Sequence, residues 1–164
     1  MNKKTGLLDE MAKNHKAEIV TWSETYATGV ELIDNQHKEL VKLTNELYRA
    51  CLSGKETANT VFRESMSRMV EYVRFHFSTE QTLLQHVKYP EYTEHKKQHD
   101  TLVRNILESA SEYEKGVNFV PNQFVRTLKE WIFGHIAVFD KAYALYINEQ
   151  KRKGRINDQQ LKDR

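Results

Sequence analysis

The chain has 164 residues and a net charge of +2; 29% of its residues are charged and 39% are hydrophobic. This composition predicts one soluble domain with tails and gives no reason to expect a nucleic-acid partner, and the single cysteine excludes an intrachain disulfide. The longest apolar run, WIFGHIAVF, is too short to cross a bilayer, and the first residues lack the apolar stretch of a signal peptide. We therefore expect a cytoplasmic protein that does not enter a membrane.

Apolar residues recur at spacings of three and four, which is the period of an amphipathic α-helix. The pattern covers four segments, from about residue 33 to 52, 59 to 85, 92 to 114 and 122 to 148. The stretches SGKET, VKYPEY and KGVNFVPN separate them. Short connections between long amphipathic helices predict an all-α fold, an up-down-up-down antiparallel four-helix bundle.

The segments outside these helices divide the chain. We expect residues 1–20 to be an N-terminal extension, residues 21–150 to form the bundle, and residues 151–164 to be a basic C-terminal tail in solvent. A long arm precedes the first helix, with a turn expected at Thr28 and Gly29.

Several polar residues interrupt the apolar stripes. His76 and Glu80 are four residues apart, and each such pair lies on one helix face, one turn (about 6 Å) apart. The same spacing separates His95 from His99. In the fourth segment His135 and Asp140 are five apart, about 140° around an α-helix, so they flank one point only if the carboxylate leans inward.

His37 adds a polar position to the first stripe, so all four segments contribute. A lone histidine on an apolar face is more often a hydrogen-bonded core residue than a ligand, but the joint pattern argues otherwise. Each buried polar group without a partner costs about 1–3 kcal/mol, so a compensating centre is expected, and a metal site supplies it. His15 and His86 fall outside the stripes and are not assigned to the site.

The candidate ligands are five imidazoles and two carboxylates, without a thiolate. This set disfavours iron–sulfur clusters and Cu(I), and it is too large for one tetrahedral zinc ion. It suits two six-coordinate ions bridged by carboxylates, with one position open. Iron fits these ligands, while manganese and cobalt stay open.

The sequence resembles the hemerythrin family, in its bacterial single-domain form, over roughly residues 22–147. The resemblance rests on W…TGVELIDNQHKEL and on the pattern H…HxxxE…HxxxH…HxxxxD, which is complete in order and spacing. It implies that His95, His99 and His135 bind one iron ion. His37 and His76 would bind the other, which keeps an open position for dioxygen. Glu80 and Asp140, with a solvent-derived oxo or hydroxo group, would bridge the two ions, which alternate between Fe²⁺ and Fe³⁺.

The resemblance also implies an apolar oxygen pocket, and four residues adjacent to a ligand or one turn away are candidates: Leu40, Phe77, Trp131 and Ile136. Plain core packing is the alternative for these residues. Asp34 either orients a ligand or stabilises the start of its helix through the helix dipole.

We therefore expect a non-enzymatic di-iron protein that binds dioxygen reversibly for storage, transport or delivery. A sensor of oxygen, nitric oxide or redox state is the alternative. A di-iron oxidase of the ferritin type is less favoured because the chain has no E-x-x-H motif. A metal phosphohydrolase of the HD type ranks low, because Asp100 lies about 100° off the bundle face. We expect a monomer, and the terminal extensions leave room for a protein partner.

Overall fold

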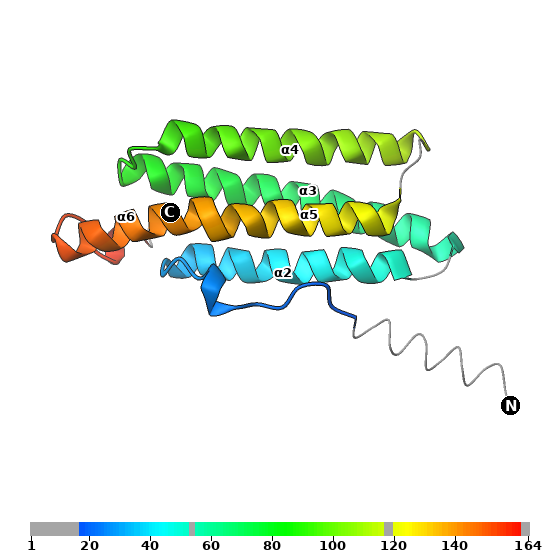
Figure 1. Ribbon diagram of the computed structural model, residues 1–164, viewed down its shortest axis with the longest axis horizontal. Helices are drawn as coiled ribbons and strands as arrows, with labels where there is room; N and C mark the ends of the chain where they lie inside the picture. Colours follow the sequence, from blue (N-terminus) through cyan, green and yellow to red (C-terminus); the bar gives the residue numbers. More distant parts are fainter. Residues whose placement is uncertain (1–16, 53–54, 117–119, 162–164) are drawn as a thin grey trace, which may run out of the picture.

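The computed structural model describes residues 17–52, 55–116 and 120–161. It is a bundle of helices α2 (Glu31–Leu52), α3 (Lys55–His86) and α4 (Tyr92–Glu114) with a fourth, continuous helix (Figure 1). The fourth helix consists of α5 (Pro121–His135), η2 (Ile136–Asp140) and α6 (Lys141–Arg152), and short 3₁₀ turns occur at η1 (Glu24–Tyr26) and η3 (Gln159–Leu161). The predicted all-α four-helix bundle is confirmed.

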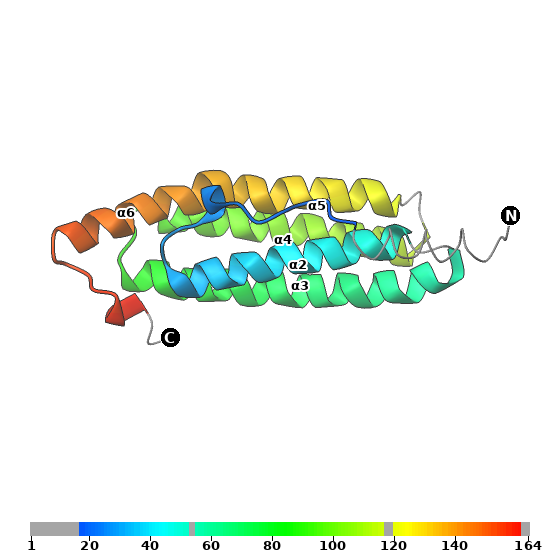
Figure 2. The ribbon, with the colours of Figure 1, turned by 90° about the horizontal axis from the view of Figure 1, so that it is seen from below.

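The helices are arranged as neighbours in a ring, with α2 and α4 each packed against α3 and α5 (Figure 2). The expected helix bounds are close to the observed ones, but α3 already begins at Lys55 and the fourth helix continues to Arg152. Of the predicted SGKET break, Ser53 and Gly54 lie outside the described residues. None of the helices in the described ranges is long and apolar enough to cross a membrane.

The fourth helix contains one wide turn, η2. The backbone N–H of Lys141 donates to the carbonyl of Ile136, five residues earlier, which is the hydrogen-bond pattern of a π-helix. In such a turn residues five apart lie one turn apart, as residues four apart do in an α-helix. His135 and Asp140 therefore come onto the same face without any leaning of the carboxylate.

Residues 17–29 form an arm that runs along α2 (Figures 1 and 2). Buried Asn45 fastens it, because its side-chain oxygen accepts the backbone N–H groups of Ile19 and Val20 and its amide donates to the Val20 carbonyl. Near the predicted turn, the Asp34 carboxylate accepts the backbone N–H groups of Thr28 and Gly29 at 2.6 and 3.1 Å. Gly29 has a φ of +76°, which glycine adopts without strain, so the predicted turn is confirmed. Asp34 thus secures the start of α2.

Two clusters of buried apolar residues fill the bundle. The larger one includes Leu47, Phe62 and Leu128, and the smaller one includes Leu84 and Ile147. Along each helix, the histidines and carboxylates singled out above lie where the apolar packing changes from the larger cluster to the smaller one. The candidate site is therefore a polar layer enclosed by apolar packing on both sides.

The C-terminal segment folds back onto the bundle. After α6 the backbone N–H of Arg155 donates to the Gln150 carbonyl, and Lys151 pairs with Asp158 at 2.6 Å. Leu161 is only 4% exposed and belongs to the smaller cluster, against which Ile156 also packs. Residues 152–155 and 157–159 are exposed, as expected of a solvated tail, but Ile156 and Leu161 depart from this expectation because their apolar side chains cover the end of the core.

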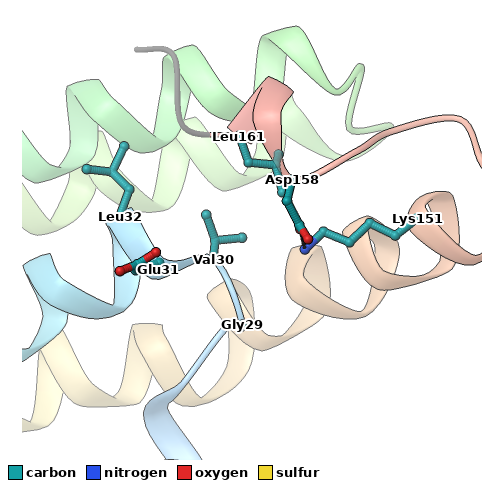
Figure 3. A pocket seen from close by; sticks show the side chains of 7 residues that line it. All are labelled: Gly29, Val30, Glu31, Leu32, Lys151, Asp158 and Leu161. Carbon is teal, nitrogen blue, oxygen red and sulfur yellow. Dashed lines mark ion pairs between the residues drawn. The ribbon is translucent and has the colours of Figure 1, made fainter.

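A cavity of about 240 Å³ lies where this segment meets the start of α2 (Figure 3). It is lined by Leu161, by the ion pair of Lys151 with Asp158, and by four consecutive residues at the entry to α2: Gly29, Val30, Glu31 and Leu32. The segment and the arm thus meet at one end of the bundle.

We expect Leu161→Ala to lower the free energy of unfolding by about 2 kcal/mol, the lower end for a buried leucine, because a segment near the terminus can detach by itself. Urea denaturation followed by circular dichroism measures this loss. Leu145→Ala is the matched control, since that side chain is 70% exposed and its removal should change stability by less than about 0.5 kcal/mol. Equal effects of the two substitutions would contradict the observed packing.

Candidate metal centre

Seven polar side chains meet in the layer between the two apolar clusters, and none is more than 7% exposed. They come from all four helices of the bundle and are the seven candidate ligands of the sequence pattern: His37, His76, Glu80, His95, His99, His135 and Asp140. Each histidine directs its Nε2 atom toward a carboxylate of the group.

The seven side chains form two overlapping groups, in each of which the facing atoms lie within 4.8 Å of one another. The three-histidine group contains His95, His99 and His135, and the two-histidine group contains His37 and His76. Glu80 and Asp140 belong to both groups. The arrangement therefore provides two adjacent places for a cation, with the two carboxylates common to both.

The two carboxylate oxygens of Asp140 face different groups. Its Oδ1 lies 3.1 Å from His135 Nε2, and its Oδ2 lies 3.3 Å from His37 Nε2. Glu80 Oε2 lies 3.1 Å from His99 Nε2, while its Oε1 is 3.9 Å from His37 Nε2. Both carboxylates thus face both groups, as a bridging ligand does.

Hydrogen bonds do not satisfy this layer. Six of its buried atoms have no hydrogen-bond partner among the described residues: Nε2 of His37, His76 and His95, Oε2 of Glu80 and both oxygens of Asp140. In addition, His99 Nε2 and His135 Nε2 are 3.0 Å apart. Ligands about 2.1 Å from one ion lie about 3.0 Å apart at right angles, so the side chains fit metal ions that would satisfy these atoms.

Burial and the shared carboxylates set the pKa values of the histidines in opposite directions. Burial lowers the pKa of His76 to about 4, and it also lowers the pKa of His99 despite the nearby carboxylate of Glu80. For His37 and His135 burial acts in the same direction, but the negative charge of the Asp140 carboxylate close to each ring outweighs it and raises the pKa. Without a metal ion, the two groups therefore each contain one histidine that holds a proton more tightly than usual.

The carboxylates keep their charge in spite of burial. Burial by itself raises the pKa of Glu80, but the surrounding histidines, His76 first, hold it well below its usual value. The pKa of Asp140 is likewise lowered, because His135 and His37 outweigh both burial and the charge of Glu80. The layer thus presents two anionic ligands at neutral pH.

A second set of residues contacts the ligands from behind. Gln36 accepts a hydrogen bond from His76 Nδ1 at 2.9 Å, and the Tyr26 carbonyl lies 3.4 Å from His37 Nδ1. Fully buried Tyr143 donates its hydroxyl to Glu80 Oε1 at 2.5 Å. The sequence reasoning missed these contacts, although Tyr143 lies three residues after Asp140 and so shares its helix face.

Among the described residues, those expected outside the site lie outside it. His86 is exposed at the end of α3, and Lys96 pairs with Asp100 across one exposed turn of α4 at 2.5 Å. His15 lies outside the described residues.

The four residues proposed as an oxygen pocket all belong to the larger apolar cluster or pack against it: Leu40, Phe77, Trp131 and Ile136. Phe77 lies directly against the polar layer: its ring stacks on His99 with centroids 3.7 Å apart, and its centroid is 5.5 Å from that of His76. Its ring therefore covers the junction of the two groups. A role for the four residues in binding a gas molecule stays a prediction.

Known proteins resemble this chain in both sequence and fold. The family model described as "Hemerythrin HHE cation binding domain" matches residues 28–145. A bacteriohemerythrin of Pseudomonas aeruginosa (strain LESB58) is 33% identical over 124 residues, which cover 76% of this chain and 78% of that protein. A bacteriohemerythrin of Methylococcus capsulatus (strain Bath) is 27% identical over 126 residues, which cover 76% of this chain and 94% of that protein.

A solved structure of wild-type hemerythrin superposes with a TM-score of 0.71 at 27% sequence identity, covering 77% of this chain and 95% of that one. The family match spans all seven residues of the buried polar layer, and the solved structure shares the bundle that brings them together. This chain belongs to the hemerythrin family.

Proposed function

We propose that this protein binds dioxygen reversibly at a di-iron centre held by the seven buried side chains. The observation that supports the proposal is the pair of overlapping ligand groups with unequal numbers of histidines, joined by two shared carboxylates. A storage, transport or delivery role fits a site that binds a small ligand without transforming it.

The ligand count gives each group its role. His95, His99 and His135 with the two carboxylates would supply five donors to one ion, and a solvent-derived bridge would complete six. His37 and His76 with the same carboxylates would supply four donors, so the same bridge would leave one of six positions open. In this proposal Glu80 and Asp140 are the bridging ligands, and the open position belongs to the two-histidine group.

Two iron ions, when bound there, would supply the reversible electron transfer that dioxygen binding needs. The protein contributes the enclosure: the ligand side chains are buried, and Leu40, Phe77 and Ile136 are each at most 4% exposed. A dry surrounding withholds the protons and water that would help to expel reduced oxygen. We assign these side chains and Trp131 to the lining of the oxygen site.

A sensing role for oxygen, nitric oxide or redox state is the second candidate. The specific observation in its favour is that segments at both ends pack on the bundle, with the arm fastened to Asn45 and Leu161 inserted in the smaller cluster. Either segment could report a change in the metal centre. An oxidase is less favoured, because the ligand set is rich in histidine rather than glutamate.

Anaerobic reconstitution with ferrous iron tests the assignment. We expect two iron ions per chain by metal analysis and an optical change on admission of oxygen that reverses when oxygen is removed. Irreversible oxidation with turnover of an added substrate would contradict the carrier role and favour the oxidase.

Substitution of one ligand tests the site residues. We expect His76→Ala to reduce the iron content from two ions to one or none, because the two-histidine group then has too few donors. His86→Ala is the matched control, since it removes an exposed histidine from the end of the same helix. Retention of two ions and an unchanged spectrum in the His76 variant would show that the ligand assignment is wrong.

The pH dependence of the metal-free protein tests the electrostatics. The pKa values of His37 and His135 are raised on folding, so their stabilising contribution is present below about pH 6.5 and is lost as the pH rises through the raised values. The lowered pKa values of His76 and His99 change the stability of the fold only below about pH 6.5, where these rings would be protonated in the unfolded chain. We therefore expect the Tm of the metal-free protein to fall as the pH rises from about 6.5 through these raised pKa values, as thermal denaturation can measure.

Metal binding should reverse this trend, because ligand histidines must release their protons and the affinity for metal then rises with pH. A Tm of the metal-free protein that rises across the same interval would contradict the raised pKa values.

A further inference from the structure

Gln36 links a ligand of the two-histidine group to the surface of the bundle. This side chain is 5% exposed, and its Oε1 lies 2.9 Å from His76 Nδ1. Its Nε2 donates to the hydroxyl of Thr79 at 3.3 Å, and that hydroxyl donates in turn to the carbonyl of Phe75 at 3.1 Å. The three contacts form one continuous chain across the interface of α2 and α3.

The chain has a fixed direction. A hydroxyl has one hydrogen, and the Thr79 hydroxyl gives it to a carbonyl that can only accept. Its oxygen is therefore left to accept, so Gln36 must present its NH₂ group to Thr79 and its oxygen to His76. An acceptor at that place requires the proton of His76 on Nδ1, which leaves Nε2 with a free lone pair.

In the metal-free protein, a nearby carboxylate favours the opposite tautomer of His76, which carries its proton on Nε2. His76 Nε2 lies 3.6 Å from Glu80 Oε2, so a proton on Nε2 would face a buried carboxylate. A ring in that state must give up its proton before Nε2 can bind a metal ion. Only a group that requires the proton on Nδ1 prevents this state.

We propose that Thr79 and Gln36 are positioning residues that fix the tautomer of His76 and so keep the two-histidine group ready for metal. Neither residue touches the ion. The hydroxyl at the surface orients the amide, and the amide orients the proton on the ring. The proposal rests on the proposed function only in that His76 Nε2 is a metal ligand.

Among the described residues, no other histidine of the layer has a side-chain acceptor this close to its Nδ1 atom. His37 Nδ1 lies 3.4 Å from a backbone carbonyl, and His99 Nδ1 lies 3.4 Å from the amide nitrogen of Gln81. The first distance is long for a hydrogen bond, and the second places a donor against the ring. His76 is therefore the ligand whose proton position depends most directly on a side-chain network.

The test compares four variants with the unchanged protein, each full-length, metal-free and labelled with ¹⁵N-histidine. Imidazole ¹⁵N–¹H correlation spectra at neutral pH report which ring nitrogen carries the proton. We expect His76 in the unchanged protein to be in the Nδ1–H form. In Thr79→Val the Nε2–H form should increase about fivefold, the effect of one neutral hydrogen bond, because the amide is then free to turn. Thr79→Ser keeps the hydroxyl and should restore the original spectrum.

Thr82→Val is the matched control. The Thr82 hydroxyl also donates to the backbone carbonyl four residues before it, that of Ser78, but it makes no hydrogen bond to Gln36. It should leave the His76 signals unchanged. Gln36→Leu, which removes the acceptor outright, should shift the tautomer at least as far as Thr79→Val. Identical His76 spectra for the unchanged protein, Thr79→Val and Gln36→Leu would overturn the proposal.

Metal retention gives the second readout. In a chelator competition with ferrous iron under anaerobic conditions, Thr79→Val and Gln36→Leu should each bind the weaker of the two ions roughly 10-fold less tightly, the lower end for a residue behind a ligand. A tautomer shift with unchanged metal affinity would show that His76 is not a ligand, which separates a failure of the proposed function from a failure of the positioning role.

Discussion

The carboxylates of Glu80 and Asp140 are fully buried, and a charge in that position is tolerated only when nearby positive charge or donors compensate it. Five imidazoles surround them, yet several of the facing atoms have no hydrogen-bond partner in the described residues. The two apolar clusters on either side close the layer to water. The bundle is thus built around a polar interior that bound cations would complete, and its apolar packing holds those ligands in place.

The π turn of the fourth helix is the local adjustment that this interior requires. A regular α-helix would direct Asp140 away from the ligands, whereas the inserted residue puts it one turn after His135. The same turn places Tyr143 one further turn along, where its hydroxyl reaches Glu80. A single extra residue therefore places Asp140 on the same helix face as His135. It also brings the hydroxyl of Tyr143 to the carboxylate of Glu80.

The contacts behind the ligands differ between the two groups. Nδ1 of His76 faces the side-chain oxygen of Gln36, whose amide also binds Thr79, while Nδ1 of His37 lies 3.4 Å from the backbone carbonyl of Tyr26 in the N-terminal arm. Because that arm is held by Asn45, the two-histidine group depends on a segment outside the bundle as well as on its own helices.

The sequence alone determined the helical class, the order of the four helices and the identity of the seven residues in the buried layer of histidines and carboxylates. Helical periodicity carries this information, because residues three and four apart must share a face. It could not reveal the π turn, since a spacing of five says nothing about backbone hydrogen bonds until the helix is packed. Contacts between distant segments were equally hidden: Gln36 meets His76 across two helices, and Leu161 joins a cluster that includes Val30 and Leu84, far away in the chain. Only the tertiary structure decided these, because they depend on which surfaces the fold leaves open.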